Sequence, residues 1–270
     1  MVEQSIFTRL DQRPVKRRVI AFDLDGTLAP SKSLLPDRMS IVLSDLLGKY
    51  EVLVMSGGRF EQFEKQLLAN LKIEPEKLAK LHLMPTCGTR YYRFRNNGWQ
   101  KQYAEDLSGT EKAKIVQELN KAVAHFGLST KKTYGPTIED RESQISWSAL
   151  GQDIVEVLGE EGIKLKEAWD PDMSKKLTLV NYLTPLLPEF EVRAGGSTTV
   201  DITKKGIDKA YGMKKMLDML KLSKDDVLFI GDRLEEGGND YPVKAMGIDC
   251  MQISDWQETA LVIEAVLRTS

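Results

Sequence analysis

Two carboxylates stand two residues apart directly after a short apolar run. Asp23 and Asp25 follow the β-branched and aromatic stretch Val19–Phe22, which predicts a buried strand. In an extended chain, side chains repeat every second residue, so both carboxylates would leave on the same side. Carboxylates held close together repel each other unless a cation or a shared proton is present. A hard divalent ion such as Mg2+, which prefers oxygen ligands, is the simplest cation to expect.

The same residues allow simpler interpretations. Asp-x-Asp-Gly is also typical of a turn, because Asp and Gly both favour turns. A calcium loop would need Gly at its sixth position and Glu at its twelfth. Counted from Asp23, those positions hold Leu28 and Leu34, so the calcium loop is excluded.

A second apolar run, residues 51–55, ends on Ser56-Gly57-Gly58, and a helical pattern follows. The Ser56 hydroxyl and the glycine amides could face a phosphoryl oxygen, with the helix N-terminus adding positive potential. The alternative is an ordinary Gly-Gly turn. We expect Ser56 and Gly57 to bind phosphate.

Further charged residues follow two later apolar runs. The run 227–230 leads into Gly-Asp232, and the chain returns through Gly-Gly to Asn239 and Asp240. These side chains offer oxygen ligands for a hard cation, although a random acidic loop would look similar. Upstream, three lysines compete for a role beside the carboxylates: Lys204, Lys205 and Lys209.

In this order, the four stretches resemble the four motifs of the haloacid dehalogenase (HAD) superfamily, in the class with large mixed α/β caps. The matching segments are DLDGTL from Asp23, SGG from Ser56, VDITKKGIDKAYG around Lys209, and GDRLEEGGNDY around Asp232. The resemblance spans about residues 19–253.

The resemblance implies a role for each motif residue. Asp23 would be the nucleophile that forms an aspartyl phosphate, and Asp25 the general acid/base. Lys209 would bind the phosphoryl group. The implied Mg2+ site is Asp232 together with Asp23, Asp25, Asn239 and Asp240.

Strands and helices alternate on both sides of a block that breaks the pattern. The alternation predicts a Rossmann-like α/β core with a parallel sheet, where ligands gather at the carboxyl ends of the strands. We expect the core to comprise residues 1–104 and 193–270, with its pattern resuming at the strand 199–202. Residues 105–192 would form an inserted mixed α/β cap that closes over the site, with helices at 108–126 and 152–168. Residues 1–18 predict a polar lead-in.

Composition limits the other functions. A net charge of -2 and a pI near 5.9 give no reason to expect nucleic-acid binding. Two cysteines fit a reduced, cytoplasmic protein, and no run of about 18 apolar residues predicts a membrane span. We expect a small phosphorylated substrate, and a monomer or a homodimer formed through the cap.

Within the superfamily, the sequence resembles the eukaryotic-type phosphomannomutases. Ile138-Glu-Asp-Arg141 is similar to that family's IEFR, so Arg141 is a candidate cap contact to the substrate. Two features depart: Gln152 stands where the family has a second phosphate-binding Arg, and Ser56-Gly-Gly is nearer the phosphatase form. A mutase must hold a bisphosphate in two orientations, so losing a cationic contact favours a sugar-phosphate phosphatase, with a phosphomutase as the alternative. A non-catalytic ligand-binding protein is disfavoured because every motif residue is present.

Overall fold

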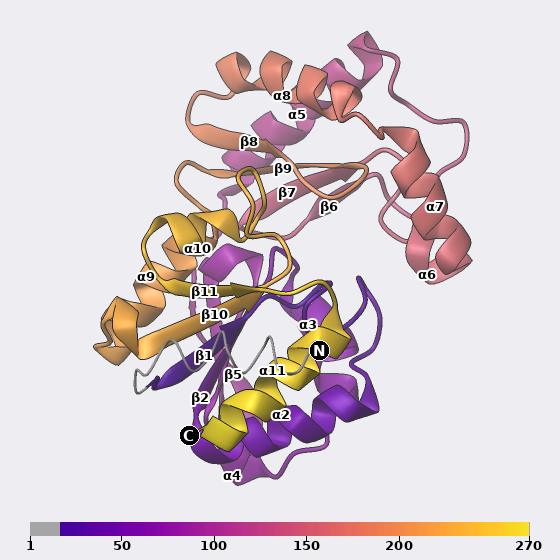
Figure 1. The fold of residues 1–270 in the computed structure, drawn as a ribbon. Helices are drawn as coiled ribbons and strands as arrows, with labels where there is room; N and C mark the ends of the chain where they lie inside the picture. Colours follow the sequence, from indigo (N-terminus) through magenta and orange to yellow (C-terminus); the bar gives the residue numbers. More distant parts are fainter. Residues whose placement is uncertain (1–16, 270) are drawn as a thin grey trace. The chain divides into compact units, whose positions relative to one another are not determined.

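The computed structural model describes residues 17–269 (Figure 1), and all but the last two residues of the lead-in expected at 1–18 lie outside this range. Contacts within the chain divide it into two compact units. The first unit contains residues 17–104 and 208–269, and the second contains 105–207. The chain therefore returns to the first unit at residue 208, whereas the sequence pattern led us to expect this at 193.

The first unit is built on a seven-stranded sheet of order β11-β10-β1-β2-β3-β4-β5. Its strands are β1 (Val19–Phe22), β2 (Glu51–Met55), β3 (Leu81–Met84), β4 (Arg90–Arg95), β5 (Gly98–Ala104), β10 (Val227–Gly231) and β11 (Asp249–Gln252). The five strands from β11 to β3 are parallel, and β4 and β5 add an antiparallel edge. This confirms the predicted α/β core with a parallel sheet.

Alternate residues of the central strands bury the two faces of this sheet. Ile20 and Phe22 of β1 pack with α2 (Asp37–Lys49), α3 (Phe60–Gln66) and α11 (Trp256–Thr269). Val19 and Ala21, which point the other way, pack with helices on the opposite face. Those helices are α9 (Lys209–Leu220) and α10 (Tyr241–Ala245). Helices on both faces explain why the strands are nearly continuous apolar runs.

The remaining elements of the first unit are short. They are α4 (Pro75–Leu78) and the 3-10 turns η1 (Leu68–Asn70), η2 (Thr86–Gly88) and η3 (Lys224–Asp226). The β4–β5 hairpin closes through Asn96 and Asn97, which both adopt left-handed φ values of 52° and 59°. This is the geometry that a two-residue hairpin loop needs, and Asn tolerates it.

The second unit has its own antiparallel sheet, of order β6-β7-β9-β8. Its strands are β6 (Ile138–Asp140), β7 (Gln144–Ser148), β8 (Phe190–Ala194) and β9 (Thr199–Lys204). Two helices, α5 (Gly109–His125) and α8 (Ser174–Leu186), share a buried cluster with this sheet. The Ser108 side chain caps α5 in a reciprocal pair with Glu111, which satisfies two backbone donors at the helix start.

Two expectations about this region are wrong. Strand β9 was expected to join the core sheet, but it lies between β7 and β8 in the sheet of the second unit. Its apolar residues, Val200 and Ile202, suit either sheet equally, so the pattern alone cannot choose. The single helix expected at 152–168 is instead two, α6 (Ile154–Leu158) and α7 (Glu160–Trp169), separated by Gly159 with φ 57°.

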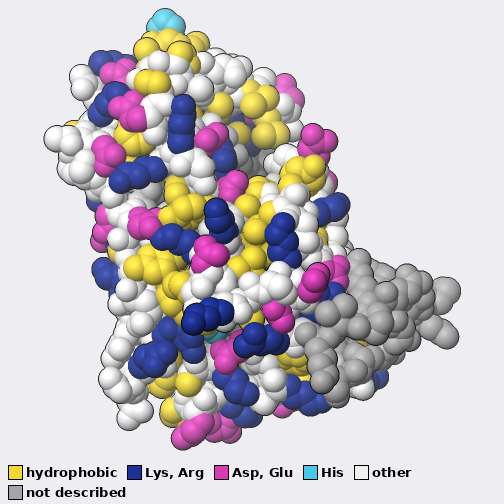
Figure 2. All heavy atoms as spheres, turned by 90° about the vertical axis from the view of Figure 1, so that its left-hand side faces the viewer, with side chains coloured by type: hydrophobic (Ala, Val, Ile, Leu, Met, Phe, Trp, Pro, Cys, Tyr) yellow, Lys and Arg dark blue, Asp and Glu magenta, His cyan; other side chains and the backbone are white. Residues whose placement is uncertain are grey.

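The surface carries both signs of charge. Figure 2 shows Lys and Arg side chains interspersed with Asp and Glu, with apolar side chains between them. Among the helices that the structure describes, none is long and apolar enough to cross a bilayer.

Candidate active site

Three parallel strands end at the same level and deliver the site's first residues. Phe22 at the end of β1 is in register with Val54 of β2 and with Ile230 of β10. Asp23, Ser56 and Asp232 each follow one of these strands within two residues of that level. The backbone N–H of Asp23 still donates to the carbonyl of Ile230 at 3.1 Å, which fixes its direction. Residues far apart in sequence thus meet at the carboxyl-terminal ends of these parallel strands.

Lys209 supplies a cation at these strand ends. It begins α9, directly after Asp208, whose side chain caps the helix by accepting from the Tyr211 N–H at 2.9 Å. Its side chain is 1% exposed, and Nζ lies 2.5 Å from an oxygen of Asp23 and 2.5 Å from an oxygen of Asp240. Of the three competing lysines, Lys204 and Lys205 are exposed and belong to the second unit.

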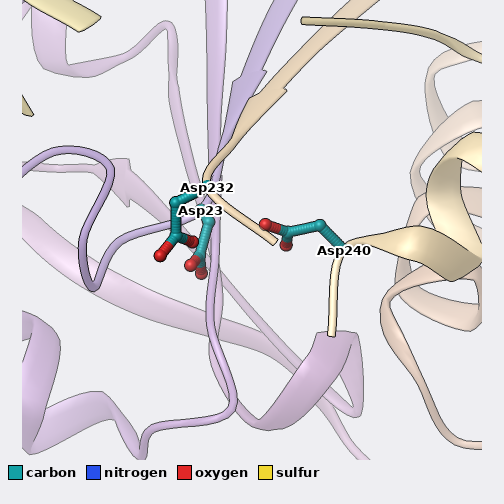
Figure 3. Close-up of side chains that lie close together, drawn as sticks. All are labelled: Asp23, Asp232 and Asp240. Atoms are coloured by element: carbon teal, nitrogen blue, oxygen red, sulfur yellow. The ribbon is translucent and has the colours of Figure 1, made fainter. Parts of the chain in front are cut away.

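Three aspartates form a compact oxygen cluster. One oxygen from each of Asp23, Asp232 and Asp240 lies within 4.8 Å of the other two, and Figure 3 shows Asp240 reaching toward the other pair from the start of α10. Asp232 Oδ1 is buried and has no hydrogen-bond partner among the described residues. A buried carboxylate oxygen without a partner is costly, so this cluster fits a hard divalent cation.

Gly26 makes room for this arrangement. Its φ of +80° is left-handed, and a Cβ placed there would lie 2.5 Å from an oxygen of Asp232. Any side chain at position 26 would therefore push Asp232 away from the cluster and strain the turn. The Gly of DxDG thus serves both the turn and the neighbouring carboxylate.

The cluster carries more negative charge than its surroundings accommodate. Burial raises the pKa of Asp23 well above its usual range, although Lys209 acts in the opposite direction. Burial, with a contribution from Asp240, raises the pKa of Asp232 to about 6. Burial acts to lower the pKa of Lys209, but the attraction of Asp23 and Asp240 outweighs it and raises this pKa. A bound cation would favour the charged forms of Asp23 and Asp232 and so lower the pKa of each.

Of the two other expected metal ligands, Asp25 lies outside this carboxylate cluster. Asn239 is exposed in the loop before α10. The carboxylate of Asp25 accepts hydrogen bonds from the backbone N–H of Lys32 and from the amides of Gln62 and Gln66. No sequence motif pointed to these two glutamines. Their spacing of four residues on the helix after Ser56-Gly-Gly, which puts both on one face, was the available signal.

Ser56 is 3% exposed at the end of β2. Its hydroxyl oxygen accepts from the Gly58 N–H at 3.1 Å, so its own proton is left to donate. The Gly58 amide is thereby used within the loop. A Cβ at Gly57 would meet nothing within 4 Å, so there is open space on that side of the residue.

In the second unit, Arg141 and Gln152 both make contacts within their own sheet region. Arg141 Nε pairs with Glu139 Oε2 at 2.8 Å, and its side chain is largely covered. Gln152 is buried, and its amide donates to the Ser146 carbonyl at 3.3 Å.

Residues 20–242 match the family model of haloacid dehalogenase-like hydrolases. The chain belongs to this family. The match covers the turn of Asp23 at its start and the loop of Asp240 at its end, which are the segments that meet in the cluster. Membership supports enzymatic phosphoryl chemistry for the chain.

Individual relatives and solved structures agree with this family. The chain is 25% identical over 233 residues to a phosphomannomutase of Encephalitozoon cuniculi, covering 84% of each chain. It is 27% identical over 244 residues to a phosphomannomutase of Spinacia oleracea, covering 85% of this chain and 88% of that one. A Plasmodium falciparum IMP-nucleotidase shares its fold, with a TM-score of 0.68 at 16% identity over 98% of this chain and 71% of that chain. A haloacid dehalogenase-like hydrolase from Bacteroides thetaiotaomicron shares it with a TM-score of 0.61 at 17% identity over 93% and 100% of the two chains.

Proposed function

We propose that this protein is a Mg2+-dependent phosphohydrolase that acts on a small phosphomonoester, in particular a sugar phosphate, through an aspartyl-phosphate intermediate. The observation that carries the proposal is the buried Lys209 ammonium between Asp23 and Asp240, beside the unpartnered oxygen of Asp232. This arrangement supplies a nucleophile together with positive charge for an anionic group.

The proposed reaction begins with attack by a carboxylate oxygen of Asp23 on phosphorus. Asp25 donates a proton to the leaving oxygen as the P–O bond breaks, which leaves a phosphorylated Asp23 and an alcohol. Asp25 then removes a proton from the water that attacks this intermediate. Ser56, the Gly57 backbone and Lys209 hold the phosphoryl oxygens throughout, and Lys209 offsets their charge.

The metal fits the acidic cluster. Asp23 and Asp232 are the ligands we propose, with Asp240 at the edge of the shell. Both oxygens of Asp240 are already engaged, Oδ1 by Lys209 Nζ at 2.5 Å and Oδ2 by the Arg233 N–H at 3.1 Å. Bound Mg2+ would neutralise charge on the transferring group as a Lewis acid. Asp25 and Asn239 complete the proposed shell less directly, since the Asp25 carboxylate lies outside the aspartate cluster and Asn239 is exposed.

Hydrolysis is preferred over isomerisation on account of the second unit, which we propose as the inserted cap. Arg141 is the proposed cationic contact to the substrate, while the neutral amide of Gln152 occupies the place of a second cation. A phosphomutase is the alternative, and it is favoured by the phosphomannomutase relatives that match over 84% or more of this chain. The proposal keeps the cytoplasmic setting predicted from the two cysteines.

The test is an incubation with hexose 1-phosphates and hexose 6-phosphates, Mg2+ and a catalytic amount of hexose bisphosphate. Release of inorganic phosphate supports the phosphatase, whereas isomer interconversion without release supports the mutase. Asp23→Asn should abolish turnover with the fold intact, and Asp45→Asn, an exposed change on α2, is the matched control. Near-normal activity of the Asp23→Asn protein would refute the assigned nucleophile.

A further inference from the structure

Two glutamines on one helix hold the carboxylate of Asp25. Gln62 Nε2 donates to Asp25 Oδ2 at 2.9 Å, and Gln66 Nε2 donates to Oδ1 at 3.0 Å. The backbone N–H of Lys32 donates to Oδ1 at 2.7 Å. We refer to Gln62, Gln66 and the Lys32 N–H as the Asp25 clamp. Both oxygens of the carboxylate are thus engaged by neutral donors, which orient it without forming an ion pair.

The donors of the clamp fix one another. Gln62 Nε2 also donates to Gln66 Oε1 at 3.0 Å, so the nitrogen of Gln66 is the atom left to face Asp25. The backbone carbonyl of Gln66 accepts from the Leu35 N–H at 2.7 Å, which ties α3 to the segment that follows the Asp25 turn. Gln66 is buried, so its amide direction is restricted by packing as well. The clamp is therefore a connected polar network rather than a pair of isolated contacts.

Gly58 is shaped to admit this clamp. A Cβ at position 58 would lie 2.0 Å from Gln62 Oε1 and 2.6 Å from its Cδ, so even an alanine would displace the amide. The backbone φ of Gly58 is outside the left-handed range, so its conformation alone does not call for glycine. The neighbouring Gly57 meets nothing within 4 Å. The second glycine of Ser56-Gly-Gly is thus explained by the Gln62 side chain.

We propose that Gln62 and Gln66 are positioning residues that aim Asp25 at the leaving-group oxygen, and that Gly58 is required because it seats Gln62. The inference rests on the proposed phosphoryl transfer, in which Asp25 gives its proton to the departing oxygen as the P–O bond breaks. A proton donor acts only from within hydrogen-bond reach of that oxygen, so a carboxylate released from the clamp is aimed less well.

Leaving groups of different basicity separate this role from a structural one. A sugar alkoxide is a strong base and needs the proton, whereas 4-nitrophenolate departs without it. For each protein, kcat/KM is measured with glucose 6-phosphate and with 4-nitrophenyl phosphate, because kcat/KM reports the steps up to departure of the leaving group. The variants are Gln62→Ala, Gln66→Ala, Gly58→Ala and the double variant Gly58→Ala/Gln62→Ala. Glu64→Ala, on the exposed face of the same helix, is the control.

Each clamp variant should lose about 10–100-fold in kcat/KM with the sugar phosphate and less than about threefold with the aryl phosphate. The double variant should match Gln62→Ala alone, because the alanine at 58 acts only through the Gln62 amide. Glu64→Ala should leave kcat/KM unchanged with both substrates.

Equal losses on both substrates, or none on the sugar phosphate, would overturn the clamp while leaving the proposed function in place. A further loss in the double variant would overturn the role given to Gly58. A wild-type protein that hydrolyses neither substrate would overturn the proposed function and the clamp's role with it. Thermal unfolding of every variant identifies a loss of activity that comes from a destabilised fold. Such a loss lowers kcat/KM with both substrates alike.

Discussion

Replacing Lys209 by Met would remove the ammonium that lies between two buried carboxylates while keeping most of the side chain's apolar length. Lys209 Nζ is 2.5 Å from both Asp23 and Asp240, and the two carboxylates are at most 4% exposed. Removing one partner of a buried ion pair costs about 3–5 kcal/mol, because the remaining charge is left uncompensated. With two carboxylates involved, we expect the upper part of this range. At about 2–4 °C per kcal/mol, a loss of about 4 kcal/mol or more should lower the melting temperature by at least about 8 °C.

The loss of stability caused by Lys209→Met should be larger at high pH than at low pH. Burial raises the pKa of Asp23, and Lys209 opposes the rise, so the variant's Asp23 pKa should be higher still. A carboxyl whose pKa is higher in the folded than in the unfolded state destabilises the protein at high pH. That penalty is relieved as the pH falls through the folded-state pKa, because the folded protein takes up the proton. The free-energy difference between wild type and Lys209→Met should therefore be larger at pH 8 than at pH 5.

Urea unfolding in the presence of a chelator, followed by circular dichroism and tryptophan fluorescence, measures this difference at both pH values. Lys214→Met, an exposed change on the same helix, is the control and should alter stability little. A loss below about 1 kcal/mol for Lys209→Met, or a loss that is the same at pH 8 and pH 5, would refute the reasoning about buried charge.

Three further changes test the site and its support. Asp232→Asn should stabilise the chelator-treated protein by about 1–2 kcal/mol at pH 8, after allowance for partial solvent screening. The reason is that the pKa of the Asp232 carboxyl, about 6 in the folded wild-type protein, exceeds its value in the unfolded chain. In urea unfolding the gain in stability should vanish near pH 4, and a loss of stability at pH 8 would contradict the prediction. MgCl2 at about a hundred times its Kd should raise stability by about 2.7 kcal/mol in a thermal-shift assay, and Asp232→Asn should largely abolish the rise; an equal rise in both proteins would place the ion elsewhere. Gly88→Ala should cost about 2–5 kcal/mol in urea unfolding, because Gly88 has a left-handed φ of +82° and a Cβ there would lie 2.3 Å from the Cα of Gly212 in α9. Gly206→Ala, with φ +76° and open space around it, should cost only the backbone strain, and equal losses in both would exclude the steric contribution.

Local sequence was sufficient to predict the strands that end directly before a polar site residue. Asp23 and Asp232 follow short apolar runs rich in β-branched and aromatic residues, which predict buried strands, and the parallel order brings the ends of those runs to one level. The helix expected at 108–126 was also readable, and the structure shows it beginning after Ser108, which is paired with Glu111 three residues on. These features depend on neighbours within a few positions, and that is the range over which sequence pattern carries physical information.

The sequence could not rank residues that reach the site from loops. Asp25 and Asp240 both looked like ligands, yet only the Asp240 carboxylate lies in the cluster with Asp23 and Asp232. The direction of a loop side chain is set by what packs beside it, as Gln62 and Gln66 show for Asp25. No spacing rule within the motif contains that information.

By itself, then, the sequence determined the α/β class, the order of the motifs, and the strand ends that carry Asp23 and Asp232. Only the tertiary structure decided that β9 belongs to the second sheet, that Lys209 lies between two carboxylates, and that Gly58 faces the Gln62 amide. The physical reason is that apolar periodicity specifies which side of a segment is buried but not which partner buries it. Partners distant in sequence are chosen by the packing of the whole unit.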